Sequence, residues 1–332
     1  MTPKYQLFLI FMIILQTMCM LYNIVLLTAT IINRRNAALP LAYIVLMSIP
    51  GILITVFLNV NVAAFAFLTE EEYENYLTAF GAQFSLGATF SYFHSLCISV
   101  LMTVNRLAII LNPFSEMFTQ RRLFGYAAVI AIVVLISLLI PYFTPCRIIF
   151  MLNHLSFISA CDPERHPITV FQNQYAILLP FTCMFVNLAI ILHLRFARND
   201  TYVKFKKFFT KNHHISAVPT VKAAEQSNLS KIQARRDLIM MRQTVAIAVY
   251  LSIYELGAFI TKCFPTVFAS LPEVVREGYF YFRLESIPMM NFFIYYLETP
   301  STRRMIRRFL NLKNNNDSTA QNATVFTVAQ RR

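Results

Sequence analysis

The amino-acid sequence predicts an all-α integral membrane protein, a seven-transmembrane helix bundle with the N-terminus outside and the C-terminus inside. Three observations predict this fold. The 332 residues are 57% hydrophobic and only 14% charged, with a mean hydropathy of +0.55, and a soluble domain could not bury so much apolar surface. Seven apolar segments are long enough to cross a bilayer. Lys and Arg gather between alternate segments. We expect the spans at residues 7–32, 39–68, 80–111, 123–143, 171–194, 244–268 and 279–297.

The first two spans set the direction of the chain. The run 7–32 is well above the ~7–15 residues of a signal-peptide core, so it should stay in the membrane. Arg34-Arg35 follows it directly, which favours a cytoplasmic first loop. Span 39–68 returns the chain to the outside, where the stretch Thr69–Glu74 carries four acids and no Lys or Arg. We interpret this stretch as an outside loop.

The third span, 80–111, carries polar residues at every third or fourth position, which form one stripe along a helical face. In hydrocarbon such a stripe should turn toward other helices or a wet cavity, which predicts the central helix of the bundle. Alternatively, the Ser and Thr hydroxyls bond back to their own helix, although this does not explain an arginine. The stripe consists of Ser85, Thr89, Tyr92, Ser95, Ser99, Thr103 and Arg106.

The remaining connections alternate as the orientation requires. The loop 146–168 holds the only two cysteines between spans, Cys146 and Cys161, and a disulfide is expected there because this loop faces the oxidising exterior. The long connection 195–243 carries eleven basic residues and should be cytoplasmic. Of the 29 Lys and Arg residues, 23 lie on the predicted inside and four on the outside, and the bias survives when the long connection is left out.

Two features follow the seventh span. Residues 301–312 place apolar side chains on one side and arginines on the other, which predicts a short amphipathic helix on the inner leaflet. The segment 314–332 is polar and Asn-rich, and we expect a disordered cytoplasmic tail. The seven-transmembrane domain would then occupy residues 1–313.

Several functional classes are disfavoured. No Cys or His spacing suggests a metal, and no Gly-rich phosphate loop or nucleophile elbow occurs, so we expect neither a cofactor nor an enzyme. The formal charge of +13 does not suggest nucleic acid, because the basic residues are explained by topology.

Two short motifs carry a family resemblance. Asn105-Arg106-Leu107 lies at the inner end of the third span, where G-protein-coupled receptors usually carry an acid, an arginine and an aromatic residue. Near the inner end of the seventh span, Asn291 and Tyr295 resemble the Asn-Pro-x-x-Tyr motif of those receptors, with Phe292 in place of the proline. The resemblance implies a switch role for both motifs. Arg106 is also explained as a positively charged residue at the inner boundary.

Other features narrow the resemblance. The chain has no tryptophan, and no cysteine stands at the outer end of the third span. The motifs Asn112-Pro113-Phe114-Ser115 and Thr299-Pro300-Ser301-Thr302 are similar to those of the nematode serpentine chemoreceptors of the Srg superfamily, within which class V is favoured. This resemblance implies a multi-pass plasma-membrane receptor of chemosensory neurons that signals to a heterotrimeric G protein.

Charges within the spans point to a ligand site. Lys262 and Glu285 lie at similar depth, roughly 7–10 Å from the outer ends of their helices, and could pair; a structural tie between two helices is the alternative. Glu255 lies two turns below Lys262 on the same face. Together with Gln83 and Tyr92, these residues would line an outward-opening pocket for a small amphipathic odorant or pheromone.

The inner contact with a G protein would comprise Asn105, Arg106, Arg242, Asn291 and Tyr295, together with the helix 301–312. A ligand-gated channel or small-molecule transporter is the alternative function. Against it, the sequence has no internal repeat, no paired broken helices and only six glycines.

Overall fold

The computed structural model describes residues 3–33, 41–111, 116–152, 156–161, 163–198, 242–243, 245–257, 259–260 and 263–310. Lys262, the predicted tail 314–332 and most of the connection 195–243 lie outside the described residues. The described chain is almost entirely helical. Its α-helices are α1 (Pro3–Ile32), α2 (Leu41–Phe67), α3 (Glu70–Tyr76), α4 (Ala82–Leu111), α5 (Gln120–Tyr142), α6 (Pro167–Tyr175), α7 (Leu178–Arg198), α10 (Pro265–Ala269), α11 (Glu273–Asn291) and α12 (Pro300–Phe309).

Shorter elements interrupt or join these helices. Two π-helices, η1 (Leu77–Gly81) and η3 (Phe292–Glu298), continue α3 into α4 and α11 toward α12, and η2 (Glu116–Phe118) is a 3-10 turn before α5. The strands β1 (Ile148–Met151) and β2 (Ser156–Ser159) form an antiparallel hairpin. Between α7 and α10, a described helical segment runs from Val245 to Gly257 and corresponds to the predicted sixth span; we call it the sixth-span helix.

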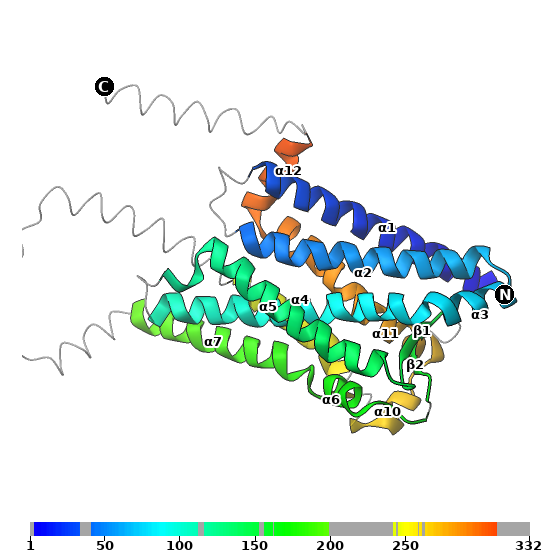
Figure 1. Ribbon diagram of the computed structural model, residues 1–332. Coiled ribbons are helices and arrows are strands. Elements are labelled where there is room, and N and C mark those ends of the chain that lie inside the picture. The colour runs from blue at the N-terminus through cyan, green and yellow to red at the C-terminus, as the bar shows by residue number, and fades with distance from the viewer. Residues whose placement is uncertain are drawn as a thin grey trace, which may run out of the picture.

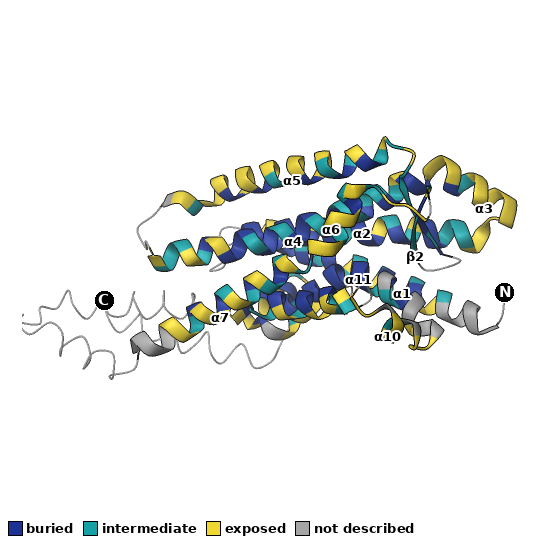
Figure 2. Cartoon of the chain, turned by 90° about the horizontal axis from the view of Figure 1, so that it is seen from below, coloured by how far each residue is buried: buried dark blue, intermediate teal, exposed yellow. Residues whose placement is uncertain are grey.

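The long helices run side by side along one direction (Figure 1). The start of α1, α3, the β1–β2 hairpin and α10 lie at one end of the bundle, and α12 lies at the other. We call these the hairpin end and the α12 end. Helix α4 lies between α5 and α7 and also contacts α2 and α11, so the predicted third span is indeed central (Figure 2).

The polar stripe of the third span turns inward on α4. Ser85, Tyr92, Ser95, Ser99 and Thr103 are all buried. Both interpretations of the stripe hold, because the Ser and Thr hydroxyls donate to carbonyls of their own helix and two of them also accept from other elements. Ser85 Oγ accepts from the Phe150 amide of β1 (2.7 Å), and Thr103 Oγ1 accepts from Asn187 Nδ2 of α7 (3.0 Å).

The acidic stretch Thr69–Glu74, interpreted above as a loop, is largely helical. Thr69 is the N-cap of α3: its hydroxyl accepts from the Glu72 amide (3.4 Å), and Glu72 Oε2 accepts from the Thr69 amide (2.9 Å). This reciprocal capping box is readable from the Thr-x-x-Glu spacing. The helix that leads into α4 therefore begins well before residue 80.

Two other helices depart from the predicted limits. Helix α11 begins at Glu273, although the span was expected at 279–297. The fifth span, 171–194, is divided between α6 and α7 at Ala176-Ile177. Pro180 has no N–H to donate to the Ala176 carbonyl, and this carbonyl accepts from the Leu179 amide (3.2 Å) instead.

Within the described residues, five helical stretches are long and apolar enough to cross a membrane: Leu9–Ile32, Leu41–Phe67, Glu70–Leu111, Gln120–Tyr142 and Pro167–His193. The sixth-span helix is a shorter apolar helix. Helix α11 is more polar, since it contains Arg283 and Glu285. The outer face of α5 is exposed along its length and bears Val129, Ile132, Val133 and Ile136, as expected for contact with lipid (Figure 2).

Candidate functional site

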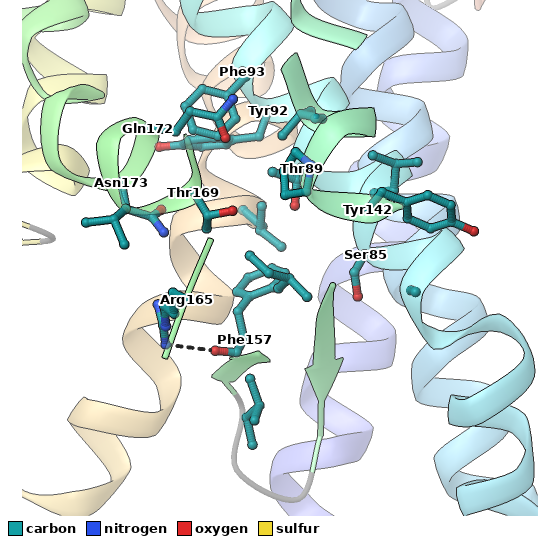
Figure 3. Close-up of a pocket in the computed structure, with 18 of the residues that line it drawn as sticks. Ser85, Thr89, Tyr92, Phe93, Tyr142, Phe157, Arg165, Thr169, Gln172 and Asn173 are labelled. Atoms are coloured by element: carbon teal, nitrogen blue, oxygen red, sulfur yellow. Dashed lines mark hydrogen bonds between the residues drawn. The ribbon is translucent and has the colours of Figure 1, made fainter. Parts of the chain in front are cut away.

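A cavity of about 550 Å³ opens among the helices near the hairpin end (Figure 3). Its walls come from α4, α5, both strands, the segment that leads into α6, α6 itself, and α11. Residues far apart in the sequence therefore meet around one space. The lining residues are Ala82, Ser85, Leu86, Thr89, Tyr92, Phe93, Leu138, Pro141, Tyr142, Ile148, Phe157, Ile158, Arg165, Thr169, Val170, Gln172, Asn173, Arg283 and Leu284.

The hairpin is held over this cavity by bonds to two helices. The Phe150 amide of β1 donates to Ser85 Oγ of α4, and its carbonyl accepts from Asn61 Nδ2 of α2 (3.3 Å). Tyr73 of α3 donates to Asn61 Oδ1 (3.3 Å). A disulfide joins Cys146, before β1, to Cys161, after β2. These restraints fix Phe157 and Ile158 of β2 against the cavity.

A buried ion pair lies on the α11 side of the cavity. Arg283 Nε and Nη2 donate to the two carboxylate oxygens of Glu255, each over 2.9 Å. The Tyr92 hydroxyl donates to Glu255 Oε1, and the Arg283 guanidinium carbon lies 5.3 Å from the centre of the Tyr92 ring. Glu255 is 0% exposed and Arg283 9%. This triad links α4, the sixth-span helix and α11, and its bidentate geometry is the strongest form of an arginine–carboxylate contact.

Of the predicted ligand residues, only some lie at the cavity. Tyr92 lines the cavity, whereas Glu255 contacts it only through Tyr92 and Arg283. Gln83 is exposed and does not line the cavity, because the neighbouring positions Ala82 and Ser85 hold the inward face of α4. Its ligand contact remains a prediction.

Glu285 is fully buried but does not line the cavity either, and neither carboxylate oxygen has a hydrogen-bond partner among the described residues. The predicted pairing of Glu285 with Lys262 lies outside what the structure describes.

Sequence reasoning missed two cations of the cavity. Arg283 carries the same signal as Lys262, a charge within an expected span, but the sequence analysis does not include it among the site residues. Arg165 lies between β2 and α6 and donates from Nη2 to the Phe157 carbonyl (3.2 Å) (Figure 3). Its place in the loop 146–168 gave no sign that the loop folds back over the bundle.

A second polar cluster lies farther along α11, toward the α12 end. Asn291 Nδ2 donates to Asn23 Oδ1 of α1 (2.7 Å) and to the Met47 carbonyl of α2 (2.9 Å). Asn23 Nδ2 in turn donates to the Cys19 carbonyl (2.8 Å). Gly51 of α2 packs against both amides, since a Cβ placed there would lie 2.9 Å from Asn23 Oδ1 and 3.0 Å from Asn291 Nδ2. Asn291 therefore joins three helices.

The other predicted switch residues lie near the α12 end. Arg106 of α4 lies within electrostatic range of the hydroxyls of Tyr43 and Tyr295, so the two sequence motifs lie in the same region of the bundle. Asn105 beside it is buried.

Arg242 is exposed, and the adjacent Gln243 donates to Thr299 Oγ1, which donates to the Ile294 carbonyl (2.8 Å). The described residues contain no group of three His, Cys, Asp or Glu side chains that could hold a metal ion.

The backbone is similar to that of a solved structure. The crystal structure of squid rhodopsin superposes with a TM-score of 0.62, at 12% sequence identity, over 94% of this chain and 89% of that chain. The chain therefore shares the helix-bundle fold of squid rhodopsin.

Sequence comparison places the chain more narrowly. Residues 38–188 match the family model described as Caenorhabditis serpentine receptor-like protein, class xa. Serpentine receptor class XA 10 of Caenorhabditis elegans is 31% identical over 299 residues, which cover 88% of this chain and 87% of that protein. The chain belongs to the serpentine receptor class xa family and is a multi-pass membrane protein. The serpentine-receptor prediction is confirmed, whereas the matches name class xa and give no support to class V.

Proposed function

We propose that this protein is a chemosensory receptor that binds a small external molecule in the cavity and signals to a heterotrimeric G protein. One observation carries the proposal. Tyr92 and Arg283 line the cavity, and through Glu255 they connect three helices, α4, α11 and the sixth-span helix. A ligand that contacts Tyr92 or Arg283 would change the balance of forces between α4, the sixth-span helix and α11. It shifts the bundle between two states only to the extent that it binds them with different affinity.

In this proposal the hairpin end faces the exterior and the α12 end faces the cytoplasm, as the distribution of Lys and Arg favours. Helix α12 buries Thr302 and Ile306, while Arg304 and Arg308 are exposed. It would lie on the inner leaflet with its arginines near anionic lipid. Arg106, Arg242 and α12 would contact an acidic surface of the G protein. The cell would be a chemosensory neuron and the membrane its plasma membrane.

The test combines topology with coupling. Tags at both termini are stained before and after permeabilisation, and a panel of small volatile and water-soluble molecules is screened for a second-messenger response. The wild type is compared with Arg106→Ala and with a control, Arg147→Ala, at the hairpin end. The proposal expects an outside N-terminus, an inside C-terminus and a response that only Arg106→Ala abolishes at equal surface expression. Two inside termini, or a ligand-evoked current that survives G-protein blockade, would favour a channel instead.

A further inference from the structure

The charges around the cavity are of one sign. Of the described residues that line it, two are ionic, Arg165 and Arg283, and both are cations. The nearest carboxylate that the structure pairs with them, Glu255, is 0% exposed and does not line the cavity. A ligand inside the cavity therefore meets positive charge and no negative charge from the described lining.

The two arginines differ in how far their charge is balanced. Arg283 donates hydrogen bonds from Nε and Nη2 to the Glu255 carboxylate, so its charge is locally neutralised. Arg165 donates to the neutral Phe157 carbonyl, and no described carboxylate pairs with it. Arg165 lies at the hairpin end of the cavity, opposite Tyr92 (Figure 3). Among the described residues, the cation without a paired carboxylate is thus Arg165, which is exposed at the rim, and the ion-paired Arg283 is at the far end.

Between these two ends, the walls are mainly apolar. The apolar lining residues include Leu86 and Phe93 of α4, Leu138 of α5 and Phe157 of β2. Neutral hydrogen-bonding groups come mainly from Thr89, Thr169, Gln172 and Asn173. Such a lining accepts a mostly hydrophobic body with a few neutral polar groups, and the volume suits a small molecule.

We propose that the ligand is a small amphipathic carboxylate whose anionic group is bound by Arg165. The planar guanidinium fork matches a single carboxylate in two parallel hydrogen bonds. The hydrophobic body would lie between Phe93 and Leu138, and any hydroxyl would reach the Gln172 or Asn173 amide. This inference rests on the proposed function and names the ligand class of its cavity.

The test uses the purified full-length chain in nanodiscs and measures how much each probe raises the thermal unfolding midpoint. The probes are hexanoate and octanoate, their methyl esters and the matching alkylamines. The variants are Arg165→Gln, Arg165→Lys and, as a matched control, Arg147→Gln, which removes an arginine before β1 that does not line the cavity. We expect the acids to act at lower concentration than the esters and amines. Arg165→Gln should weaken the acids by about 10- to 100-fold, the usual effect of losing a charged hydrogen bond, and Arg147→Gln should leave them unchanged.

Arg165→Lys keeps the charge without the fork, so it should retain the preference for acids over esters with weaker binding. This variant also decides the matter where Arg165→Gln does not fold. Acids that act no better than esters, amines that act better than acids, no stabilisation by any acid, or an unchanged response of Arg165→Gln would each overturn the inference.

The same probes in the signalling assay separate this inference from the proposed function. A neutral or cationic probe that signals while the acids do not would refute the carboxylate and leave the receptor function standing. An acid that binds in nanodiscs through Arg165 but evokes no second messenger would support the carboxylate ligand and count against the receptor function.

Discussion

Asn291 of α11 and Asn23 of α1 are joined by a 2.7 Å hydrogen bond between their side-chain amides, and Gly51 of α2 packs against both. Such an arrangement leaves no room for a side chain on α2 at this level. A glycine and two asparagines therefore form a tight contact between the three helices, and Asn291 lies on the same helix as the ion-paired Arg283.

Gly51→Ala should destabilise the protein by about 1–3 kcal/mol, because the new methyl group would overpack the two amides. The unfolding midpoint in detergent measures this. Gly125→Ala on α5 is the matched control, since a Cβ there meets nothing within 4 Å; it should be neutral or add up to about 1 kcal/mol through helix propensity. Equal effects of the two substitutions would show that the α1–α2–α11 contact is looser than described.

Arg283→Met should cost about 3–5 kcal/mol of unfolding free energy, because it leaves the Glu255 carboxylate buried without its cation. The double variant with Glu255→Leu should recover much of that loss, since it removes both charges together. Denaturant unfolding of the single and double variants forms a complete cycle. A double variant no more stable than Arg283→Met would mean that the triad stabilises the fold by something other than charge compensation.

Glu285→Gln should leave stability unchanged or raise it by about 1 kcal/mol, because the carboxylate has no hydrogen-bond partner among the described residues and a neutral amide is cheaper to bury. The same unfolding assay measures it. A clear loss of stability would instead favour the sequence-based pairing with Lys262. A cycle with Lys262→Met would then show a coupling between the two positions.

Cys146→Ser should lower the unfolding free energy by about 3 kcal/mol, because the disulfide closes a loop between cysteines 15 residues apart. Hydrogen exchange in β1 and β2 should accelerate at the same time. Cys263→Ser, which removes an exposed free cysteine, is the control and should change stability by less than about 0.5 kcal/mol. Unchanged exchange in the hairpin would indicate that Ser85 and Asn61 hold it without the bridge.

The sequence allowed the central helix to be recognised because a polar stripe inside an apolar run has a physical cost, and burial against other helices removes it. The partner of each intramembrane charge could not be recognised in the same way. Arg283 and Glu285 are two positions apart, which places them about 200° around the helix from each other. Depth can be counted from residue numbers, but the rotation of α11 cannot, so the sequence does not tell which of these two charges faces the cavity.

The hairpin escaped prediction for a different reason. Its strands have four residues each, and nothing in their pattern says that they lie over a cavity. Ser85 was assigned to the polar stripe, but its bond to the Phe150 amide depends on tertiary contact alone. Arg165 becomes a cavity residue only through this fold of the loop.

The π-helix η3 gives α11 a wider turn just before α12 begins. A π turn holds one more residue than the α turn it replaces, so the seven residues Phe292–Glu298 contain more residues per turn than an α-helix of the same length would. If one residue of η3 rewinds into α geometry, everything beyond it advances by about 1.5 Å and turns by roughly 100°. The chain that follows η3, up to the start of α12, would turn with it, while the ion pair at Arg283, which lies before η3, would stay in place.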